Sequence, residues 1–232
     1  MAADARSNMR GRTRPAQHDR RRVLAAGAAA VLALGLAGCD RAPPSGSGSG
    51  SGSGGSSSKA GFSSIDITGA DYARTLNLTD AAGKPRSLAE FKGKVTVVFF
   101  GYTQCPDVCP TTMSELASIK KALGPEGARV QPVFVTVDPE RDTPAVLAAY
   151  VASFGPDFVA LRGDAAQTQA AAKEFKVFYA KVPGKTEGSY TMDHTAGSYV
   201  FDTQGRVRLF TRYGAPANGL RADLERLLDE KG

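Results

Sequence analysis

Short apolar runs recur along the chain from about residue 76 onward. They are rich in β-branched and aromatic side chains, which pack well on a pleated sheet, so each run predicts a strand. Residues 76–80, followed by a turn at 82–84, predict an opening hairpin. The other predicted strands are 95–100, 130–137, 158–161, 177–180, 198–201 and 207–210, with the last two joined at Thr203-Gln204-Gly205.

Between these strands lie segments whose apolar residues recur at helical spacing. Residues 113–123 predict one helix, and Thr112 and Glu115 have the spacing of a capping box at its start. Asp142-Thr143-Pro144 and Asp164 predict the starts of two further helices, and residues 218–230 predict the last one. Strands that alternate with helices favour an α/β fold built on one sheet.

The N-terminal part of the chain has a different pattern. Arg20-Arg21-Arg22 precedes 14 mostly apolar residues, 23–36, and Leu36-Ala37-Gly38-Cys39 closes the run. This order is typical of an export signal, and the apolar run is shorter than the ~20 residues that span a bilayer. The closing four residues also resemble the bacterial lipobox, in which the cysteine is acylated. We therefore predict a lipoprotein signal peptide at residues 1–38 and lipidation of Cys39, with an uncleaved short anchor as the alternative.

Residues 45–58 consist almost entirely of serine and glycine. Such a composition cannot bury a core and is typical of a flexible tether. We assign residues 39–61 to a lipidated N-terminus and linker, and residues 62–232 to one globular domain of ordinary size.

The positive charge of the chain is concentrated in the predicted signal peptide. The formal net charge is +6, and residues 1–38 hold seven arginines against two aspartates, so five of these charges belong to the signal. The remaining domain is nearly neutral and has no basic stripe with interleaved aromatic residues. This composition argues against nucleic-acid binding.

Two of the three cysteines lie four residues apart in Cys105-Pro106-Asp107-Val108-Cys109, shortly after the predicted strand 95–100. A helical pattern follows, so both sulfurs are expected at a strand-to-helix turn. A helix N-terminus favours anions, so a thiol there is expected to ionise more easily, and thiolate is the form of cysteine that attacks disulfides or binds soft metals. The spacing alone leaves open a structural disulfide, a redox pair and a metal site.

Three segments of the chain resemble, in order, the signatures of the Sco (SenC-type) copper proteins of cytochrome oxidase assembly. They are residues 99–112, 134–144 and 190–195. The resemblance implies a thioredoxin-like α/β fold with a central mixed sheet flanked by helices. It also implies that one copper ion per domain binds to Cys105, Cys109 and the distant His194. Many relatives have a histidine just before the first cysteine, where this chain has Gln104.

The implied donor set suits copper. Two thiolates and one imidazole suit Cu(I), and the imidazole lets the same site hold Cu(II). A structural zinc site usually has a fourth protein ligand, and the sequence after Cys39 contains no other cysteine or histidine. We expect His194 in a loop before a strand, with Asp193 either hydrogen-bonded near the site or solvated. Residues 137–144 are explained as a strand end, turn and helix cap, with a role for Asp138 near the metal as a further hypothesis.

From this resemblance, with the lipobox and the linker, we expect a membrane-tethered copper metallochaperone, and thiol-disulfide reductase activity stays open. It is expected in the bacterial cell envelope, lipid-anchored to the periplasmic face of the inner membrane. Its partner is the copper-bearing subunit of cytochrome c oxidase, whose binuclear copper centre receives the metal. A periplasmic copper donor or thiol reductant would act before it.

Two other function classes stay open at this point. Cys105 and Cys109 as a redox-active disulfide would make a thiol-disulfide oxidoreductase that keeps the oxidase cysteines reduced. Dedicated reductases of this fold carry a shorter Cys-x-x-Cys motif and a facing proline where this chain has His194-Thr195-Ala196, which favours metal binding. A copper or redox sensor is the third class, and a peroxidase lacks the resolving arrangement that it needs.

Overall fold

The structure is a computed structural model of the 232-residue chain, and it describes residues 61–230. The predicted signal peptide, Cys39 and the Ser/Gly tract lie outside the described residues. Within the described part, we find no helix with the length and apolar character needed to cross a membrane.

An eight-stranded mixed sheet forms the centre of the domain. Its strands are β1 (Ile65–Asp66), β2 (Asn77–Asp80), β3 (Pro85–Ser87), β4 (Val95–Gly101), β5 (Val130–Thr136), β6 (Val159–Arg162), β9 (Gly197–Phe201) and β10 (Val207–Arg212). They lie in the order β1-β10-β9-β4-β5-β6-β2-β3. β5 pairs parallel with both β4 and β6, whereas the other pairings are antiparallel. The opening hairpin and the predicted mixed sheet are thereby confirmed.

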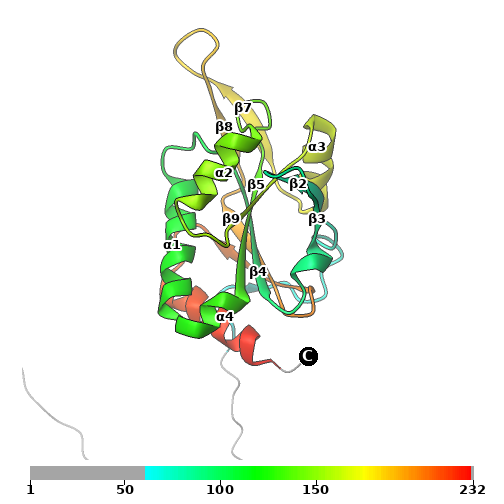
Figure 1. Cartoon of the computed structure of the whole chain (residues 1–232), viewed down its shortest axis with the longest axis vertical. Coiled ribbons are helices and arrows are strands. Elements are labelled where there is room, and N and C mark those ends of the chain that lie inside the picture. Colours follow the sequence, from blue (N-terminus) through cyan, green and yellow to red (C-terminus); the bar gives the residue numbers. More distant parts are fainter. Residues whose placement is uncertain (1–60, 231–232) are drawn as a thin grey trace, which may run out of the picture. The chain divides into compact units, whose positions relative to one another are not determined.

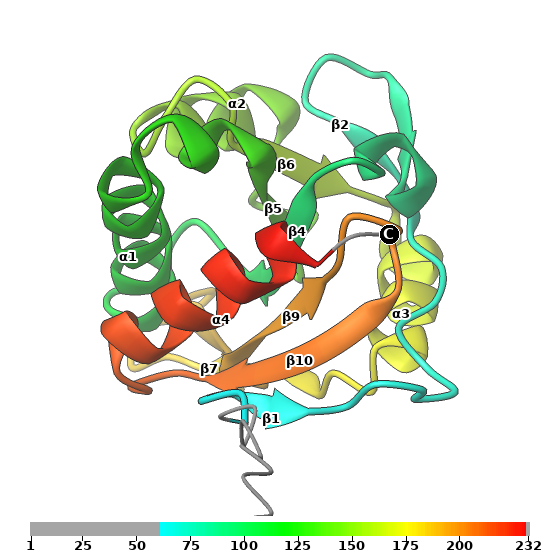
Figure 2. The ribbon, with the colours of Figure 1, turned by 90° about the horizontal axis from the view of Figure 1, so that it is seen from below.

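The two central strands are buried along their whole length, which explains their continuous apolar runs. Figure 2 shows α1 (Val108–Ala122) and α4 (Ala217–Asp229) on one side of the sheet and α3 (Ala165–Glu174) on the other. Successive side chains of β4 point to opposite sides of the sheet. The Phe99 ring lies 6.3 Å from Phe134, and the Phe100 ring lies 5.0 Å from Phe175, just after α3. The remaining helical segments are α2 (Pro144–Ala152) and the 3-10 turns η1 (Leu88–Phe91) and η2 (Gly124–Arg129).

A second, two-stranded sheet was only partly predicted. It consists of β7 (Tyr179–Pro183) and β8 (Tyr190–His194), which pair antiparallel. The predicted strand at 177–180 overlaps β7, but no strand was predicted at β8, which has five residues of which only Met192 is buried. Figure 1 shows this hairpin projecting from the upper end of the domain. The expectation that His194 lies in a loop is wrong, because it is the last residue of β8.

The starts of α2 and α3 agree with the sequence prediction, whereas the start of α1 does not. α1 begins at Val108, and the Thr112 hydroxyl donates to the Val108 carbonyl at 2.8 Å inside the helix, so the predicted capping box is wrong. α2 begins as predicted, but its cap is Thr143, while Asp142 is buried. Asp164 caps α3 as predicted, since its carboxylate accepts from the Gln167 amide at 2.8 Å.

The loops after β4 and β5 meet at one end of the sheet because the two strands run parallel. The amide of Val137 donates to the Gly101 carbonyl at 2.8 Å, which continues the pairing just past both strands. The first loop carries Cys105 and leads into α1 with Cys109, and the second loop carries Asp138 and Arg141. This end of the sheet is therefore where the predicted site residues lie.

Candidate metal centre

Both sulfur atoms lie where β4 passes into α1. Cys105 is in the turn and Cys109 is the second residue of α1. The turn is closed by two backbone donors, since the Cys105 amide bonds the Tyr102 carbonyl at 3.2 Å and the Cys109 amide donates to the Cys105 sulfur at 3.4 Å. Both thiols are free. The predicted strand-to-helix position of the pair is confirmed.

The two thiols differ in their exposure. Cys109 is completely buried, whereas Cys105 is partly exposed. Burial raises the pKa of the Cys109 thiol well above its usual range. A helix N-terminus stabilises an anion by about 0.3–1 kcal/mol, and desolvation can exceed that several-fold. The expectation of easier ionisation is therefore wrong for Cys109 in the metal-free protein, and a bound cation is what would favour its thiolate.

A glycine makes room for the buried sulfur. A Cβ atom placed on Gly101 would lie 2.8 Å from the Cys109 sulfur and 2.8 Å from the Phe99 ring, closer than real Cβ contacts. The last residue of β4 is therefore small because the sulfur packs against its backbone. The glycine was part of the motif in the sequence, but only the packing explains it.

His194 reaches the sulfur pair from the end of β8. Its Nε2 atom lies 3.6 Å from the Cys109 sulfur, and its Nδ1 atom lies 3.1 Å from the Thr195 carbonyl. With the ring proton on Nδ1 donated to that carbonyl, the Nε2 lone pair faces the sulfurs. Burial lowers the pKa of His194, which favours the neutral imidazole that binds metals. Tyr102 and Phe99 contact the ring edge-on, with centroids 6.0 and 5.9 Å away.

The three predicted ligands come together in space. The two sulfurs and one imidazole nitrogen lie within 4.8 Å of one another, so they could hold one metal ion. Cys109 and His194 are 85 residues apart in the sequence. This cluster is the candidate metal centre.

The acidic and amide residues that were considered near the site lie around it in different ways. Asp193 is exposed, and the His194 ring bonds the Thr195 carbonyl instead. Asp138 is buried, where it accepts from the Tyr190 hydroxyl at 2.9 Å and pairs with Arg141. Gln104 accepts a hydrogen bond from Arg141 at 3.2 Å.

Asp142 is a functional candidate that the sequence reasoning assigned to a helix start. Its buried carboxylate accepts from the Thr103 amide at 3.1 Å, from the Thr103 hydroxyl at 2.6 Å and from the Thr136 hydroxyl at 2.5 Å. Burial raises its pKa, although these hydrogen bonds oppose the shift. Asp142 therefore ties the cysteine turn to the end of β5. Because Thr103 lies 39 residues away, no local pattern could have shown this contact.

An open groove leads to one side of the metal centre. It has a volume of about 530 Å³ and is lined by Cys105 and His194, with apolar side chains that include Pro106, Val108 and Val182. Cys109 does not line it. The groove therefore exposes one sulfur and the imidazole.

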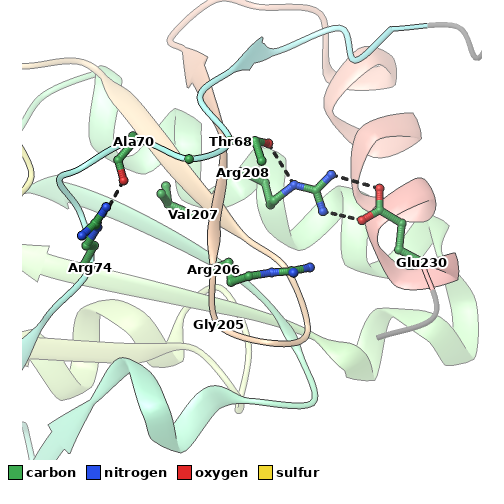
Figure 3. A pocket seen from close by; sticks show the side chains of 9 residues that line it. Thr68, Ala70, Arg74, Gly205, Arg206, Val207, Arg208 and Glu230 are labelled. Atoms are coloured by element: carbon green, nitrogen blue, oxygen red, sulfur yellow. Dashed lines mark hydrogen bonds and ion pairs between the residues drawn. The ribbon is translucent and has the colours of Figure 1, made fainter.

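A larger pocket, of about 900 Å³, lies beside β10 and contains none of the predicted site residues. Figure 3 shows that its Arg208 already donates to the Thr68 hydroxyl and to both carboxylate oxygens of Glu230. No thiol or imidazole lines this pocket. The chemistry of the domain is therefore concentrated at the smaller groove.

The fold and the cluster together define the class of protein. It is a thioredoxin-like α/β protein with two thiols and one imidazole at the carboxyl end of its central strands. The family follows from a comparison of sequences. The SCO1/SenC family profile matches residues 66–229, and the chain belongs to this family. The resemblance seen in the sequence motifs is confirmed.

The relatives include bacterial and mitochondrial proteins. The SCO2-like protein of Rickettsia felis is 38% identical over 132 residues, which are 56% of this chain and 64% of that protein. The mitochondrial SCO2 homolog of Mus musculus is 38% identical over 140 residues, which are 60% of this chain and 54% of that protein. The chain thus spans less than two thirds of the length of either relative.

Solved structures agree with the fold. ScoI of Bradyrhizobium japonicum, with copper bound, is 42% identical with a TM-score of 0.61, over 66% of this chain and 98% of that one. A SCO1/SenC family lipoprotein from Bacillus anthracis is 27% identical with a TM-score of 0.55, over 67% of this chain and 94% of that one. BsSco is a member of the Sco family of cytochrome c oxidase assembly proteins in which a disulfide switch was identified. It is 23% identical with a TM-score of 0.56, over 72% of this chain and 99% of that one. At this identity the match supports the fold alone.

Proposed function

We propose that the domain binds one copper ion through Cys105, Cys109 and His194. The observation that carries the proposal is the approach of their three ligand atoms to within 4.8 Å of one another. Two thiolates and an imidazole are soft ligands that suit copper in both of its common oxidation states. The copper-bound ScoI of Bradyrhizobium japonicum, which shares 42% of its residues with this chain, supports the same assignment.

We further propose that the protein is a copper chaperone for the binuclear copper centre of cytochrome c oxidase. The groove supports transfer by ligand exchange, because an incoming thiolate of the target reaches the metal beside the exposed Cys105. Each new sulfur–copper bond replaces one from this chain, so copper moves without a change in oxidation state. Cys105 is replaced first, and the buried Cys109 holds the metal longest.

The alternative role is thiol reduction. The Cys109 amide lies 3.4 Å from the Cys105 sulfur, so the two thiols are neighbours in the turn. Their oxidation to a disulfide would release two electrons and two protons to an oxidised cysteine pair of the oxidase, which would be reduced to two thiols. The same residues would serve both roles, so only function in cells separates them.

The position in the cell is a proposal that rests on the N-terminal sequence. We propose that Cys39 is acylated after cleavage of residues 1–38 and anchors the domain to the periplasmic face of the inner membrane. The Bacillus anthracis relative, described as a lipoprotein, supports this proposal. Mass spectrometry of the purified protein should find a lipid-modified Cys39 at the N-terminus. An intact leader or an unmodified Cys39 would contradict the proposal.

Copper titration of purified variants tests the ligand set. Cys105→Ser and Cys109→Ser should each abolish stoichiometric Cu(I) binding, because a single thiolate and an imidazole are a poor Cu(I) site. His194→Ala should lose Cu(II) and keep weakened Cu(I). If His194→Ala binds Cu(II) as tightly as the unmodified protein, the ligand assignment is wrong.

Rescue experiments separate chaperone from reductase in cells that lack the protein. Excess external copper should restore much of the oxidase activity if copper delivery is missing, because mass action replaces the chaperone. Added small-molecule thiol should restore activity if reduction is missing. The His194→Ala variant keeps both thiols, so it should fail as a chaperone. Rescue by thiol alone, together with a fully active His194→Ala variant, would favour the reductase.

A further inference from the structure

The hairpin that carries His194 is fixed to the body by polar contacts at the start of β8 and in the middle of β7. The Tyr190 hydroxyl, at the start of β8, donates to the buried carboxylate of Asp138 at 2.9 Å. The exposed Lys181 on β7 pairs with Glu140 at 2.6 Å. Both contacts join the hairpin to the loop that follows β5. The position of β8, and with it the imidazole, therefore depends on this loop.

Arg141 in the same loop contacts three separate segments. Its guanidinium pairs with Asp138, donates to the Gln104 side chain at 3.2 Å and donates to the Tyr190 carbonyl at 2.8 Å. It also lies over the Tyr190 ring, with its carbon 3.6 Å from the ring centroid. The Arg141 side chain is only 21% exposed, so these contacts are shielded from water. A guanidinium presents five donors in a fixed planar fork and stacks on aromatic rings, whereas a lysine ammonium is a compact point charge without that geometry.

The segments that Arg141 joins are those that carry the metal ligands. Gln104 directly precedes Cys105. Tyr190 is on the same strand as His194, four residues away, or ~13 Å along an extended chain. Tyr102 lies between Arg141 and His194. The centroid of its ring is 5.7 Å from the guanidinium carbon of Arg141 and 6.0 Å from the centroid of the His194 ring.

We propose that Arg141 is a positioning residue that fixes the His194 hairpin against the cysteine turn and thereby sets the affinity for Cu(II) relative to Cu(I). This inference rests on the proposed copper site. The two sulfurs belong to one turn and keep their places without Arg141, so Cu(I) is retained. Cu(II) depends on the imidazole, which only the hairpin brings to the sulfurs. Gln104 is then an acceptor for Arg141 rather than a metal ligand.

The test compares Arg141→Gln with Lys181→Gln in the full chain. Both variants remove one cation from the boundary between the hairpin and the loop, but only the first removes the bridge to the cysteine turn. Loss of a residue that orients a ligand lowers metal affinity by about 10–100-fold. We expect Arg141→Gln to lower Cu(II) affinity by at least about 10-fold, with Cu(I) affinity within about 3-fold of the unmodified protein. The sulfur-to-Cu(II) charge-transfer band should change in Arg141→Gln and stay unchanged in Lys181→Gln.

A second readout needs no copper. The imidazole protons of His194 give NMR signals that can be assigned by their loss in His194→Ala, since His18 is the chain's other histidine. In metal-free Arg141→Gln these signals should shift or broaden, and in Lys181→Gln they should not. Far-UV circular dichroism checks that each variant is folded. Arg141→Lys keeps the charge without the fork, so it should behave like Arg141→Gln, and it carries the test if the glutamine variant does not fold.

Two results would overturn the inference: an Arg141→Gln protein whose His194 signals and Cu(II) affinity match those of Lys181→Gln, or full rescue by Arg141→Lys. The failure of the copper proposal has a different signature. In that case the unmodified protein binds no copper, while the NMR comparison still shows whether Arg141 positions His194.

Discussion

The two halves of the metal centre are built on different kinds of support. Cys105 lies in the turn after β4 and Cys109 lies at the start of α1, and Phe99, Phe100 and Cys109 are completely buried. The imidazole lies at the end of β8 in the β7–β8 hairpin. Val182 in this hairpin is 44% exposed, and Phe178, just before β7, is 60% exposed. Cys109 thus belongs to the core of the domain and the partly exposed Cys105 packs against it, whereas the imidazole is supplied by a peripheral hairpin.

This difference has a consequence for the chemistry of the site. A core element opens only with global unfolding, whereas a peripheral hairpin with few buried contacts can open locally at a lower free energy. We therefore expect the hairpin that carries the imidazole to open at a lower free energy than the elements that carry the sulfurs. If copper binds as proposed, such local opening would remove the imidazole from the metal while the sulfurs keep their support.

The largest expected effect compares two phenylalanines on these two supports. Phe100→Ala should lower the free energy of unfolding by about 3–5 kcal/mol, because it leaves a cavity between β4 and Phe175. Phe178→Ala should change it by less than about 0.5 kcal/mol, because the side chain is mostly in solvent. Urea unfolding followed by circular dichroism measures both. Equal losses would show that the hairpin is as much a part of the core as β4.

The next effect concerns the two sulfurs. In the folded metal-free protein, iodoacetamide should alkylate Cys105 at least about 10-fold faster than Cys109, because burial both blocks Cys109 and raises the pKa of its thiol. Peptide mass spectrometry reads each cysteine separately. In denaturant the two rates should converge. Equal rates in the folded protein would mean that the turn opens readily and that the order of ligand exchange proposed above is wrong.

The smallest expected effect concerns the pH dependence of stability. It compares Asp142, beside the cysteine turn, with Glu230, at the end of α4. Burial raises the pKa of Asp142 above its usual 3.8, so the stability linked to its neutral form is present below that pH and is lost as pH rises through the folded value. The hydrogen bond from Arg208 lowers the pKa of Glu230 below its usual 4.5, so the stability from its ionised form is present above that pH and is lost as pH falls.

Variants of these two residues should therefore show pH dependences of opposite sign. Relative to the unmodified protein, Asp142→Asn should gain stability as pH rises above about 4, and Glu230→Gln should recover stability as pH falls below about 4.5. Urea unfolding across this pH range measures both differences. Parallel curves for Asp142→Asn and the unmodified protein would show that Asp142 titrates alike in the folded and unfolded states.

Local sequence signals predicted the main elements, and the family motifs predicted the proposed ligands. The apolar runs at β4 and β5 predict buried strands because both faces of those strands are covered. Asp164 predicts the start of α3 because an N-cap depends on residues only three positions apart. The three family motifs then indicated Cys105, Cys109 and His194.

Only the tertiary structure decided how these parts work together. The hairpin that carries His194 gives a poor strand signal because its strands are short and only Met192 among their residues is buried. Arg141 and Gln104 are 37 residues apart, and Asp142 and Thr103 are 39 apart, so neither contact leaves a local trace in the sequence. Nothing in the sequence indicated that the two sulfurs differ in exposure. The position of Cys109 at a helix N-terminus predicted an easily ionised thiol, but its burial by distant residues raises the pKa instead. Periodicity and capping report on neighbours along the chain, whereas burial and long-range hydrogen bonds exist only once the chain has folded.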